Sequence, residues 1–238
     1  MVELPFDVIP HFPRRLESCG FEHTVGFVHF LLRKYSISDL SFNTDWDVTI
    51  SSLVKRMGQV FETEVRFGIF RCFGSILLWR RTQEEKTAPV LYEGRTVPSW
   101  SWMAYSGGIN FIIDRTDRLH VPRSKDLDFT KDGKALKVQV RTFHGNCQME
   151  KREEEYALVD GTKTVGFLWF DVADLIHFKD CNCVVVSMIW DYEEKDARKT
   201  YHVLIVRKGS GRRRYKRLGV GKVEAQYVSR EFVAGTLW

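Results

Sequence analysis

The chain reads Cys183-Val184-Val185-Val186-Ser187-Met188-Ile189-Trp190 and, after a charged break, Tyr201-His202-Val203-Leu204-Ile205-Val206. Both runs are rich in β-branched and aromatic residues, which favour strands. Similar segments, separated by turn-forming residues, recur from Pro98 onward. They are Ile109–Ile113, Leu119–Val121, Leu136–Thr142, Val165–Phe170 and Tyr215–Glu224. We therefore predict about seven strands in a mainly antiparallel β-sheet, either a sandwich or an open barrel.

The first third of the chain has a helical pattern instead. Apolar residues recur at helical spacing from His23 to Tyr35. A second helix is predicted to begin after a cap at Thr44 or Asp45 and to end at Gly58. The apolar block Phe67–Trp79 is ambiguous, and we interpret it as helical.

The predicted fold class is α+β, with a helical N-terminal part packed on a mainly antiparallel β-sheet, sandwich or open barrel. We expect a helical segment at residues 1–81, a polar connector at 82–97 and a β-rich domain at 98–238. The helices and the β-rich domain are expected to form one compact unit.

The composition of the 238 residues places the chain among globular proteins. It is 44% hydrophobic and has only 17 Gly and 6 Pro, which excludes disordered and collagen-like chains. No apolar run is long enough to span a membrane, and the first residues do not read as a signal peptide. The odd number of cysteines, five, indicates reduced thiols. We expect a soluble cytoplasmic protein, with the nucleus as the other possible compartment.

The net charge of +5 is concentrated in one segment. Residues 207–217 carry seven Arg and Lys and no acid, so removing them leaves −2 on the rest of the chain. Such a segment either clamps phosphates or an acidic partner through arginine forks, or is the solvated tip of a long hairpin. We take Arg212, Arg213 and Arg214 as candidate partner-binding residues. Nucleic acid is a less favoured partner because the basic charge is local.

Trp100 and Trp102 are the other candidate binding residues. Alternation in the extended segment Pro98–Trp102 places both indoles on one face. They form either an aromatic platform for a ligand or a wedge that fills the core between the helices and the sheet.

The remaining candidates for chemistry are scattered. His144, Cys147, His177, Cys181 and Cys183 have spacings that could surround a zinc ion, but buried, inert cysteines are the commoner outcome, and we expect neither metal nor cofactor. The sequence shows no hydrolase, phosphate-loop, metalloprotease or deaminase motif. Asp114, His120 and His144 are weak candidates for acids or bases, and the sequence favours a non-enzymatic protein.

An ordered set of motifs resembles the fungal heterokaryon incompatibility (HET) proteins, in the region that follows their signature domain. The motifs are Leu32–Ser36, Leu40–Asp45, Ile50–Met57, Phe67–Ile69, Leu77–Trp79, Val97-Pro98-Ser99-Trp100-Ser101-Trp102, Gly166–Asp171 and Tyr215–Gly221. In that family the upstream TIR-like domain is thought to trigger cell death, and its signature block is not found in this sequence. The resemblance therefore implies an accessory region that binds a partner or restrains the effector.

Three functions follow from these observations. The first is a non-enzymatic interaction module with a protein partner, which regulates incompatibility or immune-type signalling. The alternative is a small-molecule binder or enzyme of secondary metabolism with a pocket near Trp100 and Trp102. Nucleic-acid binding through the basic segment is the third.

Overall fold

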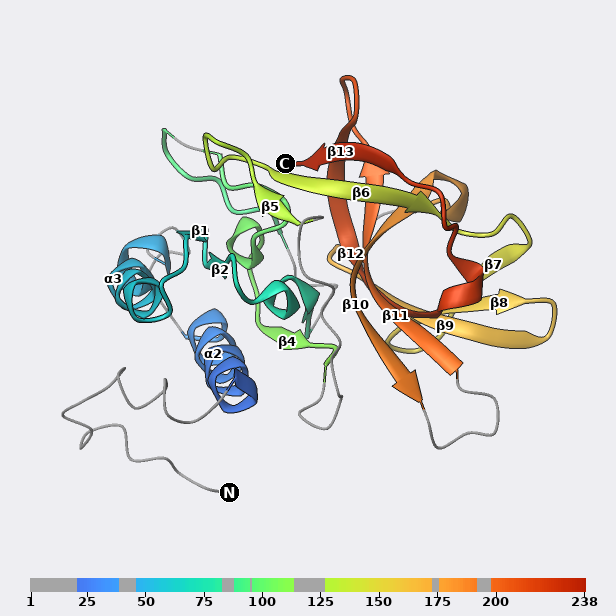
Figure 1. Ribbon diagram of the computed structural model, residues 1–238, viewed down its shortest axis with the longest axis horizontal. Coiled ribbons are helices and arrows are strands. Elements are labelled where there is room, and N and C mark those ends of the chain that lie inside the picture. The colour runs from blue at the N-terminus through green and yellow to red at the C-terminus, as the bar shows by residue number, and fades with distance from the viewer. Residues whose placement is uncertain are drawn as a thin grey trace.

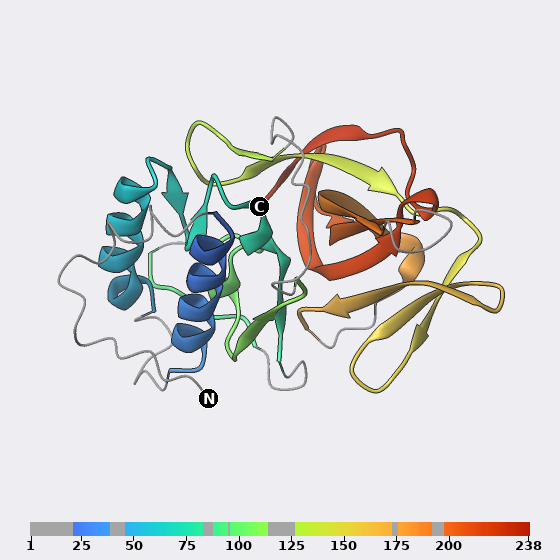
Figure 2. The same cartoon turned by 60° about the horizontal axis from the view of Figure 1, so that its bottom comes forward.

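The computed structural model describes seven stretches of the chain: residues 21–38, 46–82, 88–94, 96–113, 127–172, 176–191 and 198–238. Two α-helices and several short elements lie on one side of the molecule, and a β-barrel lies on the other (Figure 1). Figure 2 shows the same division from a second direction.

The N-terminal half contains the helices and two small sheets. The elements, in order, are α2 (Phe21–Ser36), α3 (Trp46–Val60), β1 (Val65–Arg66), β2 (Ile69–Phe70), the 3₁₀ turn η3 (Gly74–Leu78), β3 (Trp79–Arg81), the 3₁₀ turn η5 (Trp102–Ala104) and β4 (Ile109–Phe111). Strands β1 and β2 form a hairpin, and β3 pairs with β4. The His29 ring of α2 stacks on Phe111 of β4 with 3.8 Å between the ring centroids.

The C-terminal half forms a closed barrel of five strands. These are β6 (Leu136–Thr142), β10 (Cys181–Asp191), β11 (Arg198–Lys208), β12 (Arg214–Glu224) and β13 (Val233–Leu237). They pair in the order β6-β10-β11-β12-β13, and β13 returns to β6. All of these pairs are antiparallel except the short parallel pair between β12 and β13.

Other strands extend this sheet outside the barrel. β9 (Lys163–Phe170) pairs with β12, and β8 (Tyr156–Asp160) and β7 (Cys147–Lys151) follow it in a meander. β5 (Asp128–Phe129) pairs with the start of β6. The 3₁₀ turns η6 (Phe178–Asp180) and η7 (Ala225–Tyr227) precede β10 and follow β12.

Strand β11 buries both of its faces. Leu204 and Val206 of β11 belong to one core cluster, to which all five barrel strands contribute, and this cluster fills the barrel. Val203 and Ile205 belong to a second cluster with side chains of β7, β8 and β9. Burial on both faces explains why Tyr201–Val206 is an almost continuous apolar run.

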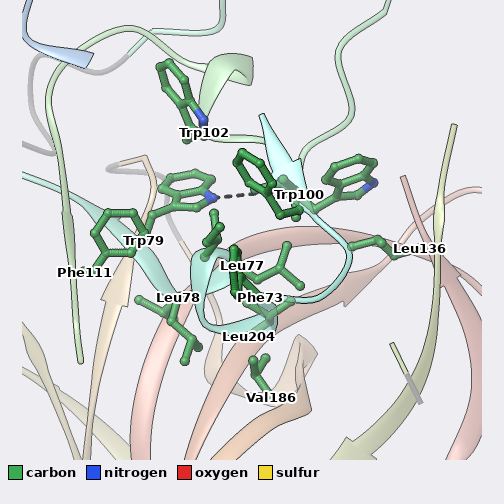
Figure 3. Packing of buried hydrophobic residues seen from close by; sticks show 14 of the residues in the cluster. Phe73, Leu77, Leu78, Trp79, Trp100, Trp102, Phe111, Leu136, Val186 and Leu204 are labelled. Atoms are coloured by element: carbon green, nitrogen blue, oxygen red, sulfur yellow. Dashed lines mark hydrogen bonds between the residues drawn. The ribbon is translucent and has the colours of Figure 1, made fainter. Parts of the chain in front are cut away.

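The turn η3 joins the two halves of the molecule. Its residues Ile76, Leu77 and Leu78 are at most 2% exposed and belong to the cluster that fills the barrel. Figure 3 shows Leu77 and Leu78 above Val186 and Leu204 of the barrel strands. The barrel is therefore filled partly by side chains from outside its own strands.

A buried ion pair fixes the same junction. The Arg217 guanidinium of β12 donates to the Asp171 carboxylate over 2.8 Å and to the carbonyl oxygens of Leu77 and Trp79. Its Cζ lies 3.3 Å from the centroid of the Trp79 ring. Arg217 and Asp171 are at most 1% exposed, so both charges depend on these partners rather than on water.

A second buried arginine holds the segment around η5. Arg81 donates to the carbonyl oxygens of Trp102, Tyr105 and Gly107. Burial lowers its pKa to about 10, still far above neutral pH, so the side chain stays charged.

The predicted fold class is wrong in two respects. In the described part of the chain, strands account for far more residues than helices, and the main sheet closes into a barrel. The sheet closes because β13, which the sequence analysis did not predict, fills the gap between β12 and β6. The block Phe67–Trp79 was predicted as a helix but forms a hairpin turn, η3 and the start of β3, because a short apolar run has no periodicity that separates these alternatives.

Candidate interaction site

Trp100 and Trp102 lie in the core. Both are 0% exposed. The Trp79 indole donates to the Trp100 carbonyl over 3.1 Å (Figure 3). The centroids of the Trp100 and Phe67 rings lie 5.6 Å apart in an edge-to-face arrangement. This is the arrangement expected of a core wedge, since an aromatic platform for a ligand needs an exposed ring face.

The three candidate arginines lie at the tip of the hairpin between β11 and β12. Arg212, Arg213 and Arg214 are exposed, as are the flanking Lys208 and Lys216. No carboxylate of the described residues lies within ion-pair distance of these five cations. The tip therefore presents five positive charges to solvent.

The backbone of this tip is held in place by the end of the chain. The Thr236 amide donates to the Arg213 carbonyl over 2.9 Å, and the Trp238 amide donates to the Tyr215 carbonyl over 3.1 Å. The Arg214 guanidinium lies 5.6 Å from the centroid of the Trp238 ring. Arg213 has a φ of 60°, a backbone conformation that glycine adopts more readily than arginine.

Arg217 does not belong to this basic tip, although the sequence groups it with the others. Its full burial removes one of the seven charges from the surface. Tyr215 and Arg217 are buried while Lys216 between them is exposed, which is the alternation of a strand. That alternation is the sequence signal that could have separated Arg217 from the exposed cations.

The histidine and cysteine candidates are only partly brought together. Cys147, Cys181 and Cys183 belong to one buried cluster, whereas His144 and His177 are exposed. Burial raises the pKa of all three thiols, to about 11 for Cys181 and about 12 for Cys183. Within the described stretches, no three His, Cys, Asp or Glu side chains could hold one metal ion. Asp114 and His120 lie outside the described residues.

Ser187 and His202 form a buried pair that no sequence motif indicates. The Ser187 hydroxyl lies 2.9 Å from His202 Nδ1, a contact typical of an activated nucleophile. Both residues are 0% exposed, so no substrate reaches the hydroxyl. Burial, followed by the charge of Lys222, lowers the pKa of His202 to about 4, which keeps the imidazole neutral.

A groove of about 610 Å³ lies between α3 and the β1–β2 hairpin. It reaches Met103, the residue after Trp102, and so lies close to the position where the alternative function expects a pocket. Its volume is in the range of small-molecule sites.

The chain matches no protein-family model, no curated protein and no solved structure. The resemblance to HET proteins therefore depends on the ordered sequence motifs alone. Neither of the described helices is long and apolar enough to cross a membrane.

Proposed function

We propose that this chain is an interaction module that binds an acidic protein segment through the tip of the β11–β12 hairpin. The observation that carries the proposal is the group of five exposed cations on a backbone tied to the end of the chain. Figure 1 shows the hairpin tip extending away from the barrel beside β13.

The fixed backbone makes this tip more than a solvated loop. A binding surface that is already ordered loses less conformational entropy when a partner binds. Arginine forks bind carboxylates through two parallel hydrogen bonds, which gives both affinity and orientation. Clusters of arginine are a recurring means of recognising acidic and phosphorylated peptide segments.

The proposed purpose of this binding is regulation, as the resemblance to HET proteins implies. As part of this proposal, the module binds or restrains a partner in incompatibility or immune-type signalling. The support for that role is the ordered set of motifs between Leu32 and Gly221.

Binding of a fluorescent oligo-glutamate peptide tests the proposal. The variant Arg212→Glu/Arg213→Glu/Arg214→Glu is expected to weaken the affinity by at least about tenfold, because three forks are replaced by like charges. Glutamate at position 213 adopts a positive φ as readily as arginine does, so the substitution adds no backbone strain and the hairpin keeps its shape. The control Lys131→Glu/Lys134→Glu/Lys179→Glu makes the same change in net charge at exposed positions outside the β11–β12 hairpin and its neighbouring strand β13, and is expected to retain affinity within about twofold.

Two results would overturn the proposal. One is equal loss of peptide binding in the two triple variants, which would show that net charge alone attracts the peptide. The other is tighter binding of duplex DNA than of the peptide, with the steep salt dependence of phosphate contacts, which would assign the hairpin to nucleic acid.

A further inference from the structure

The groove between α3 and the β1–β2 hairpin is a second site, independent of the basic hairpin. Val54, Gly58, Val65, Phe67 and Met103 form its apolar lining. Its polar lining residues are Lys55, Gln59, Glu62 and Thr63. The groove therefore has an apolar interior with charged groups along one side.

Glu62 occupies the position after the C-terminal cap of α3, where glycine is the most common residue. After α3, the Thr63 amide donates to the Gly58 carbonyl over 2.9 Å and the Glu62 amide donates to the Gln59 carbonyl over 3.3 Å. These are the two bonds of a Schellman motif, in which the residue after the cap adopts a left-handed conformation. Glu62 has a φ of 47°, where a side chain clashes with its own backbone and glycine does not.

Its charge is also unfavourable at this position. The C-terminus of a helix carries a partial negative charge, which favours cations and disfavours a carboxylate. Glu62 therefore has both an unfavourable backbone conformation and an unfavourable electrostatic position. A bound cation would relieve the electrostatic cost.

Phe67, on the opposite wall of the groove, is a second non-glycine residue with an unfavourable positive φ. Arg66 pairs with Ile69, so Phe67 and Gly68 form a two-residue hairpin loop with φ values of 48° and 75°. Such loops prefer Asn-Gly or Asp-Gly, because both residues need a positive φ. A phenylalanine in this position is a marked departure; the residue lines the groove, and its ring contacts Trp100.

The non-glycine residues with positive φ in the described part of the chain are Glu62, Phe67 and Arg213. Two of them thus line one groove, and the third lies at the tip of the basic hairpin. Unfavourable backbone conformations are found preferentially at functional sites, where the side chain is needed.

We propose that this groove binds a small organic cation, an ammonium group carried on an apolar or aromatic body. The Glu62 carboxylate and the aromatic side chain of Phe67 are the two kinds of group that attract such a cation, and both residues line the groove. The apolar lining accommodates the body of the ligand. Lys55 lies more than one turn before the C-terminal end of α3, whereas Glu62 follows that end, so the cationic group binds at the Glu62 end of the groove.

Three ligands with the same ring system test the charge preference: 1-naphthylmethylammonium, 1-naphthylmethanol and 1-naphthoate. Ligand-observed NMR is expected to show the cation binding about three- to tenfold more tightly than the alcohol, and the anion most weakly. The net charge of +5 on the whole chain favours the anion, so unspecific attraction cannot produce this order.

Two pairs of variants locate the site. Glu62→Gln keeps the length of the side chain and is expected to abolish the preference for the cation, whereas Glu231→Gln removes an exposed charge outside the groove and preserves it. Gln59→Trp is expected to block all three ligands, whereas Ser52→Trp, at an exposed α3 position outside the groove lining, leaves binding unchanged.

A further variant measures how much the left-handed conformation of Glu62 lowers the thermal stability of the protein. Glu62→Gly is expected to raise the midpoint of thermal unfolding by about 2–4 °C, because glycine adopts the left-handed conformation freely. The same variant is expected to lose the preference for the cation, as Glu62→Gln does.

The proposal fails if the three ligands bind equally, if the anion binds best, or if none binds the unmodified protein. It also fails if binding survives in Gln59→Trp, since the ligand would then occupy another site. None of these results depends on the hairpin arginines, so they leave the proposed interaction module untouched.

Discussion

Replacing Asp171 by asparagine is expected to lower the free energy of unfolding by about 3–5 kcal/mol. Asparagine has nearly the same shape, but it leaves the fully buried guanidinium of Arg217 without a counter-charge. Arg217 cannot escape to water, because it also binds the carbonyl oxygens of Leu77 and Trp79 and stacks on the Trp79 ring. Urea unfolding of the variant and the unmodified protein measures this cost.

A double variant separates the effect of the unpaired charge on the free energy of unfolding from the effect of the altered side-chain shape. Asp171→Asn/Arg217→Met removes both charges and is expected to recover part of the lost stability. Recovery is incomplete because the two carbonyl oxygens then lack their donor. Glu64→Gln, which breaks the exposed pair between Glu64 and Arg66, is the matched control and is expected to cost less than about 1 kcal/mol. A cost for Asp171→Asn as small as that of Glu64→Gln would show that water reaches the Arg217 site.

The sequence was informative where a strand has an unambiguous pattern. The predicted strand Leu136–Thr142 has the same bounds as β6, and the predicted helix His23–Tyr35 lies within α2. β13 was missed because Val233–Leu237 is short, contains Gly235 and is mostly exposed or half-buried, so its hydrophobic pattern is weak. Closure of the barrel depends on that strand and could not be predicted without it.

The residues of the candidate sites, like the strands, could be predicted from the sequence only in part. The exposed arginines 212–214 could be predicted because seven cations occur in eleven residues, but the burial of Arg217 depends on Asp171, which is 46 residues away in the sequence. Glu62 and Phe67 carried no local signal, because the residues that normally mark a positive φ are Gly and Asn. Their importance becomes visible only when the backbone and the groove are considered together.

Replacing Trp100 by alanine is expected to lower the free energy of unfolding by about 3–5 kcal/mol. The indole is 0% exposed and contacts the rings of Phe67 and Phe129. Phe129 belongs to β5 and Phe67 to the β1–β2 turn, so the indole connects the barrel side of the molecule with the wall of the groove. A cavity of indole size at this junction cannot collapse without moving both neighbours, which keeps the cost high.

Trp190→Ala is the matched control. Its side chain is 41% exposed on β10, so much of its apolar surface is already in contact with water and the substitution is expected to cost clearly less. Equal midpoints of urea unfolding for the two alanine variants would contradict the core position of Trp100 and would favour an exposed aromatic platform. A large cost for Trp100→Ala alone would instead show that the residue stabilises the junction on which the groove depends, because Phe67 loses the ring against which its strained turn packs.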